Sequence, residues 1–291
     1  DRVLIGGEDE EAIKSLTEIY KNWVPENKIL HTNIWSSELA KLTANAFLAQ
    51  RVSSINSIAA ICENTGADVR EVARAIGTDK RIGSKFLDSG PGFGGSCFKK
   101  DILNLVYLSN YFGLPEVADF WEEVVHINNW HQHRISKLIV KNLFGTLANK
   151  RIAILGFAFK ANTNDTRESA AIQICKDLLD EGAEVIIHDP IVESKQIEKD
   201  LGEVEGENNN YQSRYDGFWN LTNDLSSVFK DAHAIVLLTE WEEYAKIDWI
   251  SFSKGMKRPA WVFDARSIAD KQKIMEANLN FWRIGDGTII K

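Results

Sequence analysis

Residues 92–101 join a cysteine to glycines and charged side chains, a combination that can carry covalent chemistry. They read GFGGSCFKKD, so Cys97 follows three glycines and precedes Lys99 and Lys100. Glycines let the backbone approach a ligand closely, and a cysteine just ahead of a helix lies in positive potential that favours its thiolate. A thiolate can attack an aldehyde carbon and hold the product covalently. The residues alone support an inert thiol in a tight turn equally well.

Three further residues offer oxyanion or acid–base chemistry. Lys41 and Asn45 stand four residues apart in a segment with helical periodicity, so both project from one face. An ammonium group beside an amide can stabilise a developing oxyanion, although a solvated helix face would carry the same pair. Asp101 falls at a predicted helix start. By itself it favours a helix cap over a carboxylate that orients water or a neighbouring base.

A second glycine turn could bind a nucleotide. Residues 156–160 read GFAFK and follow a predicted strand, where a phosphate would lie against a helix N-terminus. The turn lacks the second and third glycines of G-x-G-x-x-G, which favours a mononucleotide diphosphate over a dinucleotide. Arg167 in the next loop and Arg266 after a later strand could each reach an anion, or each could be a surface charge.

The hydrophobic periodicity divides the chain into three regions. Residues 1–32 read as strand, helix and strand, residues 34–145 as helices, and residues 150–291 as alternating strands and helices. The helical region predicts a helix from about Ser36 to Gly66 and a capping box at Asp68-x-x-Glu71. It also predicts a helix from Asp101 to Gly113 and a long helix from Glu116 to about Leu143.

The third region predicts a doubly wound, mostly parallel sheet, so the fold class is α/β. Its strands are expected at 151–155, 184–188, 234–238, 261–264 and about 281–284. Residues 193–226 are polar and acidic, and we expect a partly mobile surface excursion there.

Composition excludes several classes of protein. The chain has 291 residues and a formal net charge of −8, which disfavours a nucleic-acid-binding surface. No apolar run reaches the roughly 20 residues of a membrane span. Three scattered cysteines and six histidines show neither a disulfide framework nor metal-ligand spacing, which favours a reducing, cytoplasmic setting and no metal. The chain opens at Asp1 without Met, directly before a strand-like run, and this favours a fragment of a larger protein.

Together these segments resemble the UDP-glucose 6-dehydrogenase family within the UDP-glucose/GDP-mannose dehydrogenases, and closely its animal-type members. The segments that carry the resemblance are DRVLIGG (1–7), WSSELAKLTANAFLAQR (35–51), SSINSI (53–58), GFGGSCFKKD (92–101), NLVY (104–107), IAILGFAFK (152–160) and DTRES (165–169). The cysteine motif downstream of a Lys-x-x-x-Asn helix is highly specific for nucleotide-sugar dehydrogenases.

The resemblance implies three domains. Residues 1–32 would be the C-terminal remnant of an NAD-binding Rossmann domain that is otherwise absent. Residues 33–147 would form the central helical dimerisation and catalytic domain, and residues 148–291 a Rossmann-like domain that binds UDP. The family reaction oxidises UDP-glucose to UDP-glucuronate with NAD, in two steps.

The resemblance also implies residue roles. Cys97 would form a thiohemiacetal and then a thioester. Lys41, with Asn45 beside it, would stabilise the oxyanion. Asp101 would activate water or position Lys41, and the resemblance favours this role over that of a helix cap. Arg167 and Lys100 would face NAD. The residues that would bind the sugar-nucleotide are Phe86, Leu87, Phe93, Gly94, Gly95, Phe159, Lys160, Arg266 and, from a neighbouring subunit, Arg81.

The implied partners are UDP-glucose and a second copy of the chain, in a dimer that can assemble further into a hexamer. Two alternatives stay open. One is a dehydrogenase for another nucleotide sugar, and the other is a non-catalytic module for UDP-sugar binding and dimerisation. Because hydride transfer needs NAD, the 291 residues by themselves fit the second alternative well.

Overall fold

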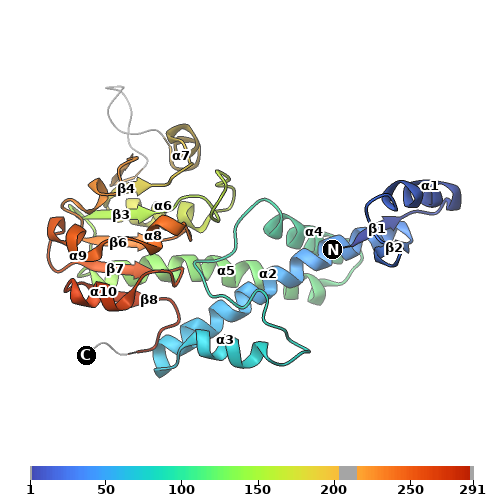
Figure 1. Ribbon diagram of the computed structural model, residues 1–291, viewed down its shortest axis with the longest axis horizontal. Coiled ribbons are helices and arrows are strands. Elements are labelled where there is room, and N and C mark those ends of the chain that lie inside the picture. Colours follow the sequence, from blue (N-terminus) through green and yellow to red (C-terminus); the bar gives the residue numbers. More distant parts are fainter. Residues whose placement is uncertain (1, 203–214, 289–291) are drawn as a thin grey trace. The chain divides into compact units, whose positions relative to one another are not determined.

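The computed structural model describes residues 2–202 and 215–288. The chain forms two compact units, residues 1–48 with 100–122 and residues 49–99 with 123–291. Figure 1 labels the helices and strands of both.

The first unit opens with a small βαβ element. Strand β1 (Val3–Gly6) pairs in parallel with β2 (Ile29–Thr32), and α1 (Glu10–Tyr20) connects them through the short helix η1 (Glu26–Lys28). Asp9 caps α1, since its carboxylate accepts hydrogen bonds from two backbone amides of the first turn, each 2.9 Å long. The predicted strand, helix and strand are confirmed.

Three long helices form the helical region: α2 (Ile34–Thr65), α4 (Phe98–Tyr111) and α5 (Pro115–Asn142). Helix α2 begins two residues before the predicted Ser36, because the Asn33 side chain accepts from the Ser36 amide at 2.7 Å. Helix α4 begins three residues before the predicted Asp101, directly after Cys97.

Helix α3 (Val69–Gly77) follows α2 and belongs to the second unit. The Asp68 side chain accepts from the Arg70 amide at 2.8 Å, so the predicted cap is confirmed at Asp68. The backbone amide of Val69 donates to the Gly285 carbonyl at 2.9 Å, and this bond ties the start of α3 to the end of the sheet.

The second unit is built on a six-stranded parallel sheet (Figure 1). Its strand order is β5-β4-β3-β6-β7-β8, the order of a doubly wound nucleotide-binding sheet with its switch point between β3 and β6. The predicted α/β class and parallel sheet are therefore confirmed. The strands are β3 (Arg151–Leu155), β4 (Glu184–His188), β5 (Phe218–Leu221), β6 (Ala234–Leu237), β7 (Trp261–Asp264) and β8 (Asn280–Arg283).

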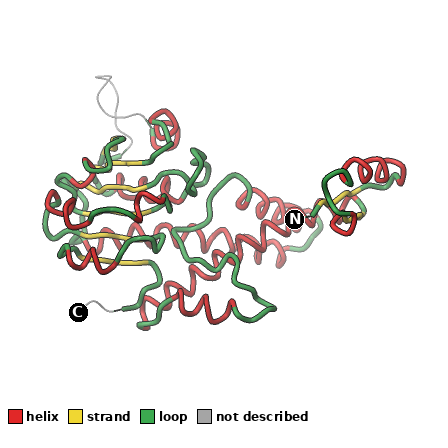
Figure 2. Tube along the Cα trace, viewed as in Figure 1, coloured by secondary structure: helices red, strands yellow, loops and turns green. Residues whose placement is uncertain are grey.

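Helices cover both faces of this sheet, as Figure 2 shows in red around the yellow strands. Side chains alternate across a strand, so Ile152 and Ile154 of β3 join one core while Ala153 and Leu155 join the other. The first core packs against α5, α6 (Ala170–Asp180) and α7 (Ser194–Leu201). The second packs against the short helices η2 (Ser227–Phe229), α8 (Glu242–Ala245), α9 (Trp249–Phe252) and α10 (Lys271–Glu276). The short helix η3 (Ser253–Gly255) follows α9 directly.

The expected surface excursion at 193–226 contains regular structure. Helix α7 lies in its first part and edge strand β5 near its end, with Trp219 only 2% exposed. The excursion prediction is wrong for these described parts, because their apolar side chains pack on the sheet. Its residues 203–214 lie outside the described residues.

Candidate functional site

The cysteine loop, residues 92–97, ends in an exposed thiol. Cys97 directly precedes α4, as the sequence predicts for a cysteine in the positive potential of a helix start. The Ser96 hydroxyl lies 3.7 Å from its sulfur. The other two cysteines, Cys62 and Cys175, are buried, and burial raises the pKa of both thiols. Cys97 is thus the reactive candidate of the three.

Glycines let the cysteine loop pack tightly against residues 159–168. The Gly95 amide donates to the Arg167 carbonyl at 2.8 Å. A Cβ on Gly94 would stand 2.5 Å from the Glu168 carbonyl oxygen, closer than real side chains allow. One on Gly95 would stand 3.1 Å from the Phe159 ring. The structure therefore brings Gly94, Gly95 and Phe159, three of the predicted substrate-binding residues, into one assembly.

Charged side chains border the same assembly. Lys99 forms an ion pair with Glu168 at 2.8 Å. The exposed Arg167 pairs with Asp165 at 2.8 Å, and this guanidinium holds the pKa of Asp165 below its usual range. The pKa of Arg167 is raised, mainly by its hydrogen bond to Asp165, with a smaller contribution from the charge of Cys97. Arg167 therefore lies near Cys97, while Lys100 is exposed at the start of α4.

Buried polar side chains to which the sequence analysis assigned no role hydrogen-bond to the backbone of the cysteine loop and of the residues just before it. Asn56 accepts from the Gly90 amide at 2.9 Å, and Asn128 accepts from the Phe93 amide at 2.8 Å. His131 donates through Nε2 to the Gly90 carbonyl at 2.9 Å. Burial lowers the pKa of His131 to about 3, so the ring is neutral near pH 7. The signal that could have found these residues is a polar side chain on an otherwise apolar helix face.

The predicted residues Phe86 and Leu87 lie on the loop after α3. Leu87 is buried, whereas Phe86 is 41% exposed and adopts a left-handed backbone with φ +61°. A bulky residue rarely takes this conformation, and such strain gathers at ligand sites. Arg81 is 90% exposed at its side chain and pairs with its neighbour Asp79 at 2.7 Å. That exposure leaves Arg81 accessible to another molecule.

Arg266 is held at the carboxyl edge of the sheet. Its Nε donates to the Leu238 carbonyl at 2.7 Å, and another guanidinium nitrogen donates to the Phe159 carbonyl at 3.0 Å. An ion pair with Glu240 at 3.1 Å adds to these bonds. Burial lowers the pKa of Arg266, and the charge of Glu240 opposes that shift. Lys160 lies over the Phe159 ring at 5.4 Å, so Phe159, Lys160 and Arg266 gather at one edge.

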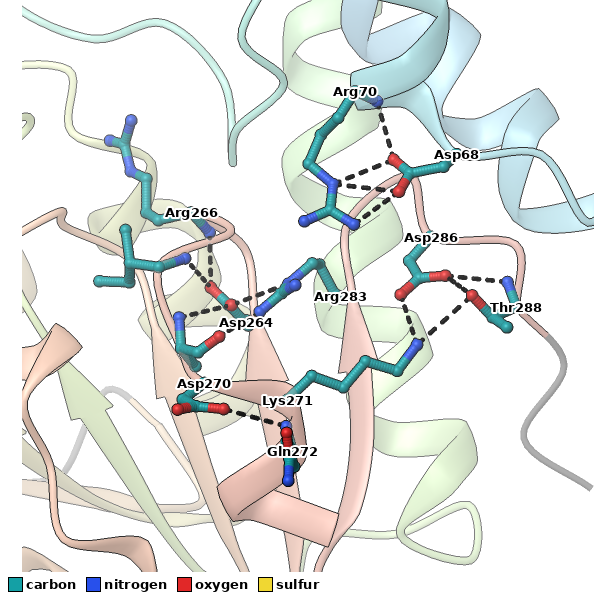
Figure 3. Close-up of polar contacts among 12 residues, drawn as sticks. Asp68, Arg70, Asp264, Arg266, Asp270, Lys271, Gln272, Arg283, Asp286 and Thr288 are labelled. Atoms are coloured by element: carbon teal, nitrogen blue, oxygen red, sulfur yellow. Dashed lines mark hydrogen bonds and ion pairs between the residues drawn. The ribbon is translucent and has the colours of Figure 1, made fainter.

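The buried carboxylate of Asp264 shapes the turn that carries Arg266 (Figure 3). It accepts from the Arg266 amide at 3.1 Å and the Ala269 amide at 3.0 Å. Arg283 donates to Asp264 at 3.1 Å and also to the Ala269 carbonyl. Both members of this ion pair are buried, so it fixes the turn from inside the protein.

The glycine turn after β3 differs from expectation. The amides of Phe157 and Ala158 donate to the Asp189 carboxylate at 2.8 and 3.0 Å. The next helix, α6, begins only at Ala170, with Ser169 as its cap. The expectation that a phosphate would lie against a helix N-terminus at this turn is therefore wrong, because an internal carboxylate already takes these amides.

Several of these segments line one cavity. It has a volume of about 390 Å³ and lies between α3, the loop after it and the turn after β7. Leu87 and Arg266, two predicted substrate-binding residues, both line it. The other lining residues are Val69, Arg70, Ala73, Arg74, Ser84, Asp88, Ser89 and Ser267.

The first unit contains a separate charged cluster. Lys41 and Asn45, one helical turn apart on α2, both donate to the same carboxylate oxygen of Asp101 at 2.5 Å. The Asp101 side chain is only 4% exposed, whereas that of Lys41 is 60% exposed. Asp101 lies inside the first turn of α4 instead of ahead of it, so its interpretation as a helix cap is wrong. Of the four predicted catalytic residues, Asp101 thus contacts two, Lys41 and Asn45.

Neither a metal cluster nor a membrane helix occurs within residues 2–202 and 215–288. No three or more His, Cys, Asp or Glu side chains in these ranges are placed to hold a metal ion. None of the helices in these ranges has the length and apolar character of a membrane span.

Comparison with known proteins gives the chain relatives over nearly its whole length. It is 50% identical over 289 residues to UDP-glucose 6-dehydrogenase of Drosophila melanogaster, covering 98% of this chain and 60% of that protein. It is 52% identical over 274 residues to the enzyme of Gallus gallus, covering 93% and 55%. The chain thus spans little more than half the length of these curated relatives.

A solved structure shows the same fold. The UDP-glucose dehydrogenase of the hyperthermophilic archaeon Pyrobaculum islandicum matches with a TM-score of 0.80 at 29% identity, over 97% of this chain and 58% of that one. Family models match residues 35–130 as the central domain of the UDP-glucose/GDP-mannose dehydrogenase family and residues 153–271 as its UDP-binding domain. The chain therefore belongs to the UDP-glucose/GDP-mannose dehydrogenase family, of which it carries the central and UDP-binding domains.

Proposed function

We propose that this chain supplies the sugar-nucleotide site and the nucleophile of an NAD-dependent UDP-glucose 6-dehydrogenase. One observation carries the proposal: the loop that ends in the exposed Cys97 packs through Gly94 and Gly95 against residues 159–168 of the UDP-binding domain. A nucleotide held by that domain would place its sugar near the thiol.

Cys97 would act as a covalent catalyst on the aldehyde. Its thiolate would attack the C6 carbonyl carbon and form a thiohemiacetal, whose oxygen takes up a proton. Loss of a hydride and that proton would leave a thioester. Water would then cleave the carbon–sulfur bond and release UDP-glucuronate with the thiol restored. Cys97 lies directly before the start of α4 and close to Arg167.

The Lys41 cluster supplies a cation, an amide and a carboxylate. Lys41 and Asn45 would donate to the oxygen on which negative charge develops. Asp101 would orient the Lys41 ammonium group and accept a proton from the attacking water. Its burial against two donors keeps it in a single position for either task.

NAD would accept the hydrides, but the described residues do not fit this cofactor. The helix that follows β1 is capped by the carboxylate of Asp9, which takes the amides that a pyrophosphate would need. The turn after β3 is likewise occupied by Asp189. Arg167 and Lys100 are exposed cations that could still face NAD held elsewhere. The described residues thus offer a site for the sugar-nucleotide and the nucleophilic thiol, but no binding site for the NAD pyrophosphate.

The sugar-nucleotide would lie along the loop after α3 and the carboxyl edge of the sheet. Leu87 and Arg266 line the cavity there, and Phe159 with Lys160 lies at the same edge. Phe86 lies on the loop after α3 and Phe93 on the cysteine loop. Arg81 would reach the substrate of a neighbouring subunit. Glucose is favoured over another sugar by the identity of 50% or more to UDP-glucose 6-dehydrogenases of two animals.

Self-association would use the aromatic surface of the first unit. Trp35, Phe47, Tyr107, Tyr111 and Phe112 are each more than half exposed. Trp35 packs edge-on against Phe112, and Tyr107 stacks on Tyr111. An exposed patch of this kind usually marks a protein interface. It supports a dimer as the minimal assembly, which could assemble further into a hexamer.

Calorimetric titration of this chain with UDP-glucose, and separately with NAD, tests the proposal. Binding of UDP-glucose without binding of NAD would support it. Tight binding of NAD without any response to UDP-glucose would overturn the assignment of the second sheet. The rival function, a binding module without catalysis, predicts the same titration. It also predicts that Cys97→Ser has no effect on UDP-glucose oxidation when the chain is joined to an NAD-binding domain.

A further inference from the structure

Arg51 on α2 binds three backbone carbonyls of one short loop. Its Nε donates to the Lys85 carbonyl at 3.0 Å, and its two terminal nitrogens donate to the Ile82 and Gly83 carbonyls at 2.8 and 2.7 Å. A guanidinium group presents its donors in one rigid plane, so it can hold three acceptors in a fixed arrangement. Arg51 therefore sets the path of the backbone from 82 to 85.

This loop has a conformation that needs such support. Gly83 has φ +72° and Phe86 has φ +61°, so two of its residues lie in the left-handed region. For Phe86 that conformation is strained, and strain of this kind persists only when surrounding contacts impose it. The three carbonyl bonds of Arg51 end at Lys85, directly before the strained residue.

The same loop forms one wall of the 390 Å³ cavity. Ser84 and Leu87, on either side of the strained residue, line it together with Arg266 from the opposite segment. Arg51 is not among the lining residues. It can therefore affect a ligand in the cavity only through the backbone that it holds.

We propose that Arg51 is a positioning residue that holds residues 82–87 in the ligand-binding conformation before the ligand arrives. This inference rests on the proposed function, because the ligand is the sugar-nucleotide assigned to that cavity. Holding the loop in advance removes the cost of ordering it during binding, and this raises affinity. Lysine cannot replace Arg51, because one ammonium group cannot donate to three carbonyls in a plane.

The test compares Arg51→Lys and Arg51→Ala with Arg151→Ala in this chain. Arg151 is a matched control, because it lies at the amino end of β3 and pairs with Glu184 at 3.3 Å. Three quantities are measured: UDP-glucose affinity by calorimetry, hydrogen exchange of residues 80–89, and affinity of the alanine variant with added guanidinium ion. All are measured well below the unfolding temperature of each variant.

Both Arg51 variants should lose about tenfold or more in affinity and exchange faster at 82–87, since three charge-assisted bonds are removed. Guanidinium should restore part of the affinity of Arg51→Ala but not of Arg51→Lys, whose side chain fills the site. Arg151→Ala should bind as the unaltered chain does. A merely structural role would lower the unfolding temperature without this rescue.

Two outcomes separate the inference from the proposed function. Unaltered affinity in Arg51→Ala would overturn the role of Arg51 and leave the proposed function in place. Absence of UDP-glucose binding by the unaltered chain would overturn the proposed function itself, and with it the ligand assigned to this loop.

Discussion

The ammonium nitrogen of Lys41 lies 2.5 Å from a buried carboxylate oxygen of Asp101, sixty residues further along the chain. The Asn45 amide reaches the same oxygen. The pairing joins α2 to α4 through polar atoms at a point where Asp101 has almost no access to water. A buried carboxylate needs such partners, because desolvation penalises an unpaired charge.

Removing the carboxylate should weaken the first unit. Asp101→Ala leaves Lys41 and Asn45 without their acceptor, but Lys41 is mostly exposed and regains water. We therefore expect a loss of about 1–2 kcal/mol in the free energy of unfolding, below the cost for a fully buried pair. Urea denaturation measures it, with Lys100→Ala as an exposed control. Equal midpoints for the two variants would contradict a stabilising role.

Substitution of Gly94 should disturb the cysteine loop more than substitution of an unconfined glycine. A Cβ at Gly94 would meet the Glu168 carbonyl at 2.5 Å, so the loop or residues 159–168 must move. Gly145 has φ +78° but nothing within 4 Å, so its alanine variant incurs only backbone strain of about 1 kcal/mol. Gly94→Ala should lower the thermal midpoint further and change the rate of Cys97 alkylation. A midpoint and a rate equal to those of the unaltered chain would show that residues 159–168 do not confine this loop.

His131 should make the stability of the second unit sensitive to acid. Its pKa is lowered by burial from the usual value of 6.5 to about 3, so the unfolded state binds the proton more tightly. The contribution of neutral His131 to the free energy of unfolding is complete above about pH 6.5 and is lost as the pH falls toward the folded-state pKa. His131→Gln keeps a donor for the Gly90 carbonyl but cannot titrate. Between pH 6.5 and 4.5, the urea midpoint of that variant should fall less than the midpoint of the unaltered chain. An equal fall in both would show that His131 is not the source of the acid sensitivity.

The buried pair of Arg283 and Asp264 should be costly to break. Arg283→Met leaves the Asp264 charge to backbone amides alone, in a site where it is fully buried. Loss of one partner of a buried pair typically costs about 3–5 kcal/mol. Urea denaturation should show a loss of that order, whereas Lys271→Ala, at a partly exposed pair, should lose less than about 1 kcal/mol. Because Asp264 shapes the Arg266 turn, UDP-glucose affinity should also fall (Figure 3).

The sequence predicted local features well where one segment determines them. Neighbouring residues determine the strands Arg151–Leu155 and Glu184–His188, the cap at Asp68 and the position of Cys97 before a helix. Strand β5 escaped prediction because its four residues lie in a polar stretch and gain their order only by pairing with β4.

The polar framework of the site could not be predicted, because its bonds cross long stretches of sequence. Asn128 reaches a backbone amide 35 residues away, and Arg51 reaches carbonyls about 30 residues away. Asp189, directly after β4, accepts from the amide of Phe157 in the glycine turn, 32 residues earlier in the chain. No local sequence pattern indicates this bond. Asp101 resembled a cap for the same reason, since its partners lie on another helix.

The most direct test of a sugar-nucleotide site beside Cys97 is its rate of alkylation by iodoacetamide, measured by mass spectrometry with and without UDP-glucose. Cys97 is the exposed cysteine, whereas Cys62 and Cys175 are buried, so modification reports on one position. The account predicts slower alkylation of Cys97 as UDP-glucose saturates the chain, and no slowing with glucose alone. Alkylation at an unchanged rate under saturating UDP-glucose would contradict the account.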